Sequence, residues 1–281
     1  TVCFHIMKRT LSFILLAACS LLPMGAQAPM DGGVWNDNTG KHINAHGGSI
    51  FNYKGTYYWY GESRSADGKP YSSLGVSCFT SKNLKDWTNH GLVLPVSSEP
   101  GSDIEGGCII ERPKVLYNAR TRKFVMWFHL EMKGKGYAAA RSGVAVSDTP
   151  FGPFRFVRSG RVNAGRYPIG FALADTTDLR QKLTEPEYKG WWTPQWYTQI
   201  ERGMFFMRDF QGGQMARDMT VFVDDDDKAY HIFSSEDNLT LNIAQLTDDY
   251  MEHNGSFVRV AAGGLNEAPT IFKQDGTYWM I

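Results

Sequence analysis

Residues 266–281 read NEAPTIFKQDGTYWMI: a carboxylate and a proline precede a short apolar strand, a polar turn and an aromatic strand. The same plan occurs three more times, with apolar strands that include Ile50, Val115 and Val221. Self-similarity of this kind is the sequence signature of a repeat architecture. The chain is therefore predicted to consist of repeated β units.

Each of the first three units contains four predicted strands, recognised by alternation and by β-branched and aromatic residues. In the first unit they cover residues 49–53, 56–61, 75–80 and 91–95. In the second unit they cover residues 114–116, 124–129, 143–147 and 154–157. In the third unit they cover residues 221–223, 229–234, 241–246 and 257–260. Repeated four-stranded units are typical of β-propeller blades. The fourth unit has only two strands, so we expect about three and a half blades. Because a propeller closes on itself, we also expect a C-terminal truncation.

The second and third units are separated by an insertion at about residues 165–213. It carries Trp191, Trp192 and Trp196 together with several prolines. An insertion on one face of a propeller can shape a binding rim, or it can only stabilise the fold. The sequence leaves both interpretations open.

Composition narrows the class of protein. The 281 residues have a formal net charge of zero and are 42% hydrophobic and 14% aromatic. A neutral chain is not attracted to nucleic acid or to an anionic membrane surface, so neither is expected as a partner. Many exposed aromatic faces would suit sugar binding, although each aromatic residue could equally be core.

The N-terminus has the pattern of an export signal. Lys8 and Arg9 precede an apolar run at residues 11–22, which is too short to span a bilayer, and small residues at 26–28 offer a cleavage site. We expect residues 1–28 to be leader and signal peptide, and residues 29–281 to form a secreted or periplasmic domain. Residues 16–19 also resemble a lipobox, which leaves a lipid anchor at Cys19 open.

Two of the four cysteines, Cys78 and Cys108, lie in the expected mature domain. An exported protein could join them in a disulfide, but buried free thiols are an equal alternative. We expect the protein to be a monomer.

Candidate catalytic residues occupy equal positions in different units. Four residues before Ile50, Val115, Val221 and Ile271, the sequence has His46, Glu111, Arg217 and Glu267. The next positions are Gly47, Arg112, Asp218 and Ala268. In a propeller the innermost strands surround the axis, so these side chains should converge at one mouth of the channel. Convergent carboxylates beside cations are suited to acid–base chemistry on a neutral polar substrate.

These motifs resemble glycoside hydrolase family 43 from about Asn44 to the end of the sequence. Residues 267–269, Glu-Ala-Pro, resemble the general-acid motif of the family, which is Glu-Gly-Pro in most members. Similarity is greatest to the subgroup of exo-β-1,3-galactanases, through residues 43–48, 59–62, 111–115, 217–219 and 234–238.

The resemblance implies a five-bladed β-propeller that cleaves glycosides with inversion. Glu267 would be the general acid, and Asp218 would raise its pKa by like-charge repulsion. Residues implied to bind the substrate are His46, Glu62, Glu111, Arg112, Tyr137, Arg217, Glu236 and Asn238.

The sequence departs from the family at one important point. Most members have Asp-Pro where this chain has Gly47 and Gly48, and that aspartate is the general base. In the galactanase subgroup the water is activated from the last blade, which we expect beyond Ile281.

We therefore predict an exo-acting, inverting galactosidase that acts on β-1,3-galactan or arabinogalactan side chains. Alternatives are an α-L-arabinofuranosidase, a β-galactofuranosidase, a β-xylosidase or a non-catalytic carbohydrate-binding propeller. No cofactor is expected, and the aspartates at residues 224–227 lack the pattern of an EF-hand. A structural calcium ion in the channel stays open, because waters could supply its ligands.

Overall fold

A computed structural model describes residues 33–67, 69, 72–172 and 176–281. The predicted signal segment, with Cys3 and Cys19, lies outside the described residues. Residues 34–281 form one compact unit, to which all that follows refers. No helix in the described ranges is long and apolar enough to cross a membrane.

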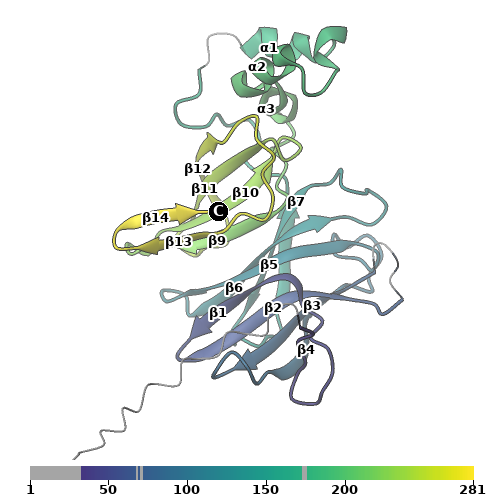
Figure 1. Ribbon diagram of the computed structural model, residues 1–281, viewed down its shortest axis with the longest axis vertical. Helices are drawn as coiled ribbons and strands as arrows, with labels where there is room; N and C mark the ends of the chain where they lie inside the picture. The colour runs from purple at the N-terminus through teal and green to yellow at the C-terminus, as the bar shows by residue number, and fades with distance from the viewer. Residues whose placement is uncertain (1–32, 68, 70–71, 173–175) are drawn as a thin grey trace, which may run out of the picture. The chain divides into compact units, whose positions relative to one another are not determined.

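Antiparallel sheets dominate the unit (Figure 1). The first sheet contains β1 (His46–Tyr53), β2 (Thr56–Arg64), β3 (Ser73–Ser81) and β4 (Thr88–Pro95). The second contains β5 (Ile109–Asn118), β6 (Lys123–Glu131), β7 (Arg141–Ser147) and β8 (Arg155–Gly160). The third contains β9 (Met219–Val223), β10 (Ala229–Ser235), β11 (Thr240–Leu246) and β12 (His253–Val260). A hairpin of β13 (Ile271–Gln274) and β14 (Thr277–Met280) follows.

All twelve strands predicted for the first three units are confirmed, and within each sheet consecutive strands are neighbours. Positive φ angles at Lys54 and Gly55, and again at Asp275 and Gly276, match the two-residue turns that the right-handed twist of a hairpin favours. The predicted all-β class is thus confirmed, whereas the number of blades stays a prediction.

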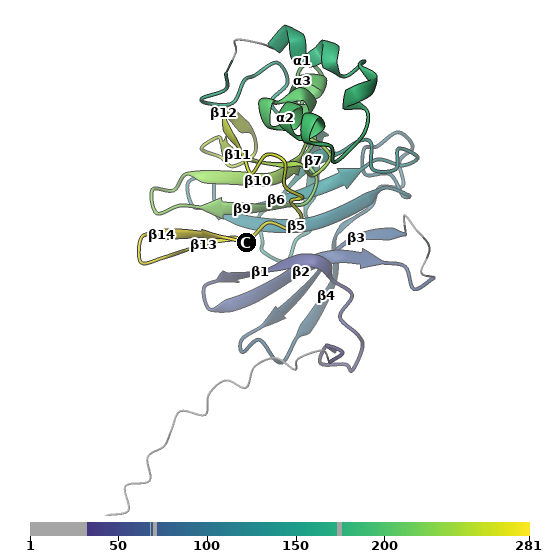
Figure 2. The same cartoon turned by 45° about the horizontal axis from the view of Figure 1, so that its top comes forward.

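The first strand of each unit contacts the first strand of the next. Contacts join β1 to β5, β5 to β9 and β9 to β13, and the turned view in Figure 2 shows the sheets following one another in chain order. The segments that precede these strands are therefore brought to one region, as the repeat predicted.

The insertion is helical, which the sequence analysis did not predict. It contains α1 (Thr176–Lys182), the 3-10 turn η1 (Pro186–Tyr188), α2 (Pro194–Arg202) and α3 (Met204–Asp209). The Thr193 hydroxyl caps α2, Pro194 begins it, and Gly203 ends it with φ of 102°. Trp196, Ile200 and Phe206 are buried in the same core as residues of the second and third sheets. The helices therefore extend the core of the domain.

A second core lies between the first two sheets and contains Cys78 and Cys108. Both are free thiols, so of the two alternatives the buried thiols are confirmed. Burial raises the pKa of each to about 12, which keeps them protonated and unreactive.

Candidate active site

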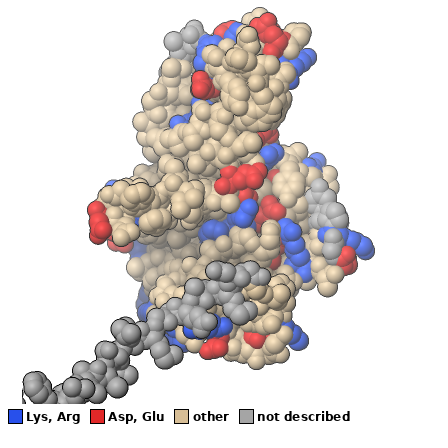
Figure 3. Space-filling view, viewed as in Figure 1, with Lys and Arg blue, Asp and Glu red and all other residues tan. Residues whose placement is uncertain are grey.

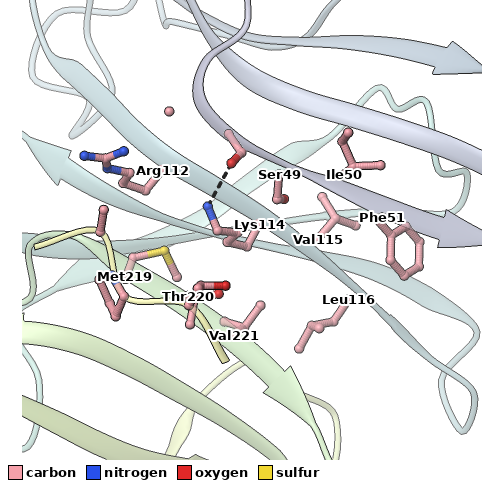
Figure 4. A pocket seen from close by; sticks show the side chains of 15 residues that line it. Ser49, Ile50, Phe51, Arg112, Lys114, Val115, Leu116, Met219, Thr220 and Val221 are labelled. Atoms are coloured by element: carbon pink, nitrogen blue, oxygen red, sulfur yellow. Dashed lines mark hydrogen bonds between the residues drawn. The ribbon is translucent and has the colours of Figure 1, made fainter. Parts of the chain in front are cut away.

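The repeated segments line one cavity of about 520 Å³. Its walls come from β1, β5 and β9, whose labelled side chains are drawn in Figure 4, and from the segment that precedes β13. The lining residues are Gly47, Gly48, Ser49, Ile50, Phe51, Arg112, Lys114, Val115, Leu116, Met219, Thr220, Val221, Ala268, Pro269 and Thr270. Four segments far apart in the sequence thus meet at a single hollow.

Lys114 points into this cavity and donates a hydrogen bond of 3.2 Å from Nζ to the carbonyl oxygen of Gly48 (Figure 4). Burial lowers the pKa of its ammonium group to about 8, and the nearby Arg112 charge adds to the effect. The sequence analysis did not select Lys114, because one lysine at the start of a strand carries no distinctive pattern.

Asp218 connects the second unit to the segment of the predicted acid. Its Oδ2 accepts hydrogen bonds from Arg112 Nη2 at 2.7 Å and from the backbone N–H of Ala268 at 2.9 Å. Burial alone would lower the pKa of Arg112, but the charge-assisted bond to Asp218 outweighs it and the pKa is raised. The structure therefore brings Arg112, Asp218 and the Glu267 segment together.

Glu267 itself is exposed, and its Oε1 accepts a hydrogen bond of 3.1 Å from Asn238 Nδ2. The Asn238 carbonyl also accepts a backbone bond of 2.8 Å from Asn266. Asn238 belongs to three consecutive residues with positive φ, Glu236, Asp237 and Asn238. Such backbone is costly for non-glycine residues, and strained segments of this kind cluster at functional sites.

A second group of polar side chains surrounds two carboxylates. Glu62 is buried and accepts a bond of 2.6 Å from Arg64 Nε, while His46 Nδ1 lies 3.4 Å away. Glu111 accepts a bond of 3.1 Å from the Tyr137 hydroxyl and lies 3.4 Å from Arg64 Nη2. His46, Glu62, Glu111 and Tyr137 are thus brought together by Arg64.

Burial affects the two carboxylates of this group differently. It raises the pKa of Glu62 despite the opposing Arg64 charge. For Glu111 the burial effect is outweighed by His129, Tyr137 and Arg64, which hold its pKa below the usual range. The Tyr137 pKa is raised to about 12 by burial and by the neighbouring Glu111. At neutral pH the group therefore presents an ionised Glu111 and a neutral phenol, which can bond to hydroxyls.

Arg217 supports this arrangement from the third unit. Its Nη2 donates to the Tyr137 carbonyl at 3.0 Å and lies 3.4 Å from Asp237 Oδ1. Asp237 is also bonded by Arg208 of α3 at 2.5 Å. Arg217 thus links the Tyr137 loop to the strained turn beside Glu267.

Glu236 does not share this surface. It is fully buried, and Arg259 binds both of its oxygens, through Nε at 2.5 Å and Nη2 at 2.8 Å. Arg259 Nη1 also donates to the Glu201 carbonyl at the end of α2 at 2.9 Å. The structure thus gives Glu236 a role in anchoring the helices, and it offers no exposed atom for a sugar.

His129 and Glu131 of β6 are two residues of the site that the sequence analysis missed. Antiparallel pairing places His129 opposite Glu111. The available signal is the alternation at the end of β6, where polar residues 129 and 131 follow apolar neighbours. Locating their partner, however, requires the register between two strands.

One set of ligand atoms could be considered for a metal. Glu111, His129 and Asp218 each bring an atom within 4.8 Å of the others. Arg112 already binds Asp218, and Tyr137 already binds Glu111. A guanidinium at this position repels a cation, and calcium prefers oxygen ligands over imidazole. The residues therefore fit pairing with protein cations better than a bound calcium ion.

Charged side chains of both signs gather near the middle of the face seen in Figure 3. This agrees with the alternation of carboxylates and guanidinium groups among the bonded residues described above. A mixed surface of this kind suits a neutral substrate with many hydroxyl groups rather than a polyanion.

No protein-family model and no curated protein matches the chain. Several solved structures are similar to it. A family 43 β-1,3-galactosidase, solved with galactodeoxynojirimycin, is 57% identical with a TM-score of 0.81 over 89% of this chain and 71% of its own. A second family 43 β-1,3-galactosidase is 36% identical (TM-score 0.67, 89% of this chain, 42% of its own).

An exo-β-1,3-galactanase from Clostridium thermocellum is 34% identical, with a TM-score of 0.67 over 89% of this chain and 44% of its own. The chain thus spans less than half the length of two of these three proteins. The 57% identity to the first of them nevertheless shows that the chain belongs to glycoside hydrolase family 43.

Proposed function

We propose that the protein is an exo-acting, inverting β-1,3-galactosidase that releases galactose from β-1,3-galactan or arabinogalactan side chains. The observation that carries this proposal is the 57% identity to a β-1,3-galactosidase. The contacts between the carboxylates support it: Arg64 binds both Glu62 and Glu111, and Glu111 has an oxygen within 4.8 Å of Asp218. Asp218 in turn accepts the backbone N–H of Ala268, next to Glu267. We further propose a five-bladed propeller fold and an exported protein.

In this proposal Glu267 is the general acid. Its exposed carboxyl group would protonate the glycosidic oxygen, and a water would attack the anomeric carbon from the opposite face. Inversion requires roughly 6.5–9.5 Å between the acid and the group that activates the water. Asn238 would orient the acid through its bond of 3.1 Å.

The remaining polar residues would bind the terminal galactose. Arg64 contacts both Glu62 and Glu111 and so links the two carboxylates. Ionised carboxylates accept strong hydrogen bonds from sugar hydroxyls. His46, Arg112, Tyr137 and Arg217 would complete the binding surface.

The test is hydrolysis of β-1,3-galactobiose and of a panel of nitrophenyl glycosides. The anomer is followed by proton NMR with the nitrophenyl β-galactoside, because galactobiose also releases its reducing-end galactose as a mixture of anomers. We expect galactose alone to be released, first as the α-anomer. Release of arabinose or xylose instead would overturn the substrate assignment, and initial β-galactose would overturn inversion. Galactose binding without any turnover would indicate a carbohydrate-binding protein.

A further inference from the structure

A buried histidine stands between two glutamates beside the proposed sugar pocket. His129 is 2% exposed, and its Nε2 lies 2.9 Å from Oε1 of the buried Glu131. On its other side, Nδ1 lies 3.3 Å from Glu111 Oε2. The other oxygen of Glu131 accepts the backbone N–H of Ala140 at 2.9 Å. The three side chains thus form a row that ends at the partly exposed Glu111.

The groups that face His129 are mostly anionic or neutral. Glu111 approaches from β5 and Glu131 from β6 itself. An oxygen of Asp218, just ahead of β9, is within 4.8 Å of the ligand atom of His129. The Tyr137 ring lies with its centroid 6.1 Å away, and Ser142 of β7 is its partner across the strands. This surrounding favours a charged imidazolium.

The electrostatic surroundings of His129 also favour its charged form. Burial disfavours the charged imidazolium, yet the negative charges of Glu111 and Glu131, which lie 3.3 Å and 2.9 Å from its two ring nitrogens, outweigh this effect and raise the His129 pKa. The same contact helps to keep the pKa of Glu111 low. With His129 charged, both of its ring nitrogens are donors and both carboxylates can accept.

We propose that His129 is a positioning residue: as an imidazolium fixed by Glu131, it holds Glu111 ionised and directed toward the hydroxyl groups of the terminal galactose. The assignment rests on the proposed function for its ligand, but the state of the row itself does not depend on any sugar. Glu111 contacts the substrate in this scheme, whereas His129 and Glu131 act only through it.

The sign of the expected pH dependence follows from the raised pKa. The His129 charge is present at low pH and is lost as the pH rises through its value in the folded protein. Glu131→Gln removes the anion that supports this charge but keeps an acceptor for Ala140. Burial then dominates, and the His129 pKa falls, so the imidazolium of the variant is lost at lower pH than in the wild type.

The first measurement is an NMR titration of the histidine rings in the complete protein, with the His129 signal assigned by its absence from His129→Gln. We expect a midpoint above the ordinary value of about 6.5 in the wild type and a lower midpoint in Glu131→Gln. A wild-type midpoint below that value would overturn the proposal, whatever the enzyme acts on.

The second measurement is galactose affinity by calorimetry between pH 5 and pH 8. Hydrogen bonds to charged groups stabilise a complex more than hydrogen bonds to neutral groups. We therefore expect Glu131→Gln to bind galactose about tenfold more weakly than the wild type at pH 7.5, and to regain wild-type affinity at pH 5. His129→Gln should be weaker at every pH. A uniform loss in Glu131→Gln at all pH values, or no loss in a folded variant, would overturn the proposal.

Glu105→Gln is the matched control, since Glu105 pairs with Lys133 at 2.6 Å on the surface. Its galactose affinity should follow the wild type across the pH range. If the wild type bound no galactose at all, the proposed function would fail, and the NMR midpoint would still decide the charge of His129.

Discussion

The carboxylate of Asp218 accepts a hydrogen bond of 2.9 Å from the backbone N–H of Ala268, the residue that follows Glu267. The same oxygen binds Arg112 at 2.7 Å. Ala268 has a φ of 46°, which an alanine adopts only when its surroundings enforce it. Asp218 therefore fixes the backbone that carries the proposed acid, in addition to any charge effect on that acid.

Asp218→Asn should lower kcat by roughly ten- to a hundredfold while changing KM little. Asparagine can still accept the Ala268 N–H, but it leaves the Arg112 guanidinium without its anion. The measurement is steady-state hydrolysis of β-1,3-galactobiose. Asp218→Ala should be worse, because it also removes the backbone contact. Equal activities for the two variants would show that the contact to Ala268 has no role in positioning the acid.

Glu267→Gln should lower kcat/KM for β-1,3-galactobiose by about 10²–10⁴, the usual contribution of a general acid. The loss should be smaller for an aryl galactoside, whose leaving group needs little protonation. Asp275→Asn, in the exposed turn of the last hairpin, is the control and should leave both rates unchanged. Full activity of Glu267→Gln on galactobiose would refute the assignment.

Glu236→Gln should act on stability rather than on substrate binding. Removing one partner of a buried ion pair costs about 3–5 kcal/mol, because the Arg259 charge is left uncompensated. Urea denaturation measures the loss, and KM below the unfolding transition should stay near the wild-type value. Glu252→Gln breaks the exposed contact with Arg158 at 3.6 Å and should cost less than about 1 kcal/mol. A raised KM with normal stability would restore Glu236 to the binding surface.

The strands were predictable because each one either alternates or is rich in β-branched and aromatic residues and is bounded by turn residues, a signal that lies within a short stretch of sequence. The helices α1, α2 and α3 were not, since each has nine residues or fewer and short helices depend on tertiary packing. Trp196 of α2 supplies such packing.

The residues of the candidate site were likewise predictable only in part. Equal offsets from the inner strands predicted the convergence of Arg112, Asp218 and the Glu267 segment, since it depends only on the repeat. The burial of Glu236 was hidden, because its partner Arg259 lies 23 residues away on another strand. The role of His129 could not be predicted for the same reason, because it depends on the strand register that places His129 opposite Glu111.

Gly48→Ala should destabilise the first unit. A Cβ added at Gly48 would lie 1.6 Å from the Tyr60 carbonyl oxygen, so the backbone of β1 or β2 would have to move. Overpacking of this kind costs about 1–3 kcal/mol or more. Gly160→Ala, where an added Cβ meets no atom within 4 Å, is the control for thermal unfolding. An unchanged melting temperature for Gly48→Ala would show that the two strands separate easily.

Acid should weaken the fold through a pair of histidines, of which His231 is fully buried and His253 partly buried. His231 Nδ1 and His253 Nε2 lie 3.0 Å apart, and burial lowers the pKa of His253 to about 3 and that of His231 well below its usual value. The unfolded chain takes up these protons near pH 6.5, so stability is fully present above that pH. It is lost progressively as the pH falls toward 3, by up to about 1.4 kcal/mol per pH unit for each histidine.

Urea denaturation between pH 7 and pH 4 measures this dependence, and His253→Phe should make it shallower by about the share of one histidine. The phenyl ring removes the titrating group but keeps an aromatic side chain against Trp127, whose ring centroid lies 5.0 Å from that of His253. His42→Gln changes an exposed histidine and should leave the slope as it is. An identical slope in His253→Phe and the wild type would show that the pKa of His253 is not lowered in the folded protein.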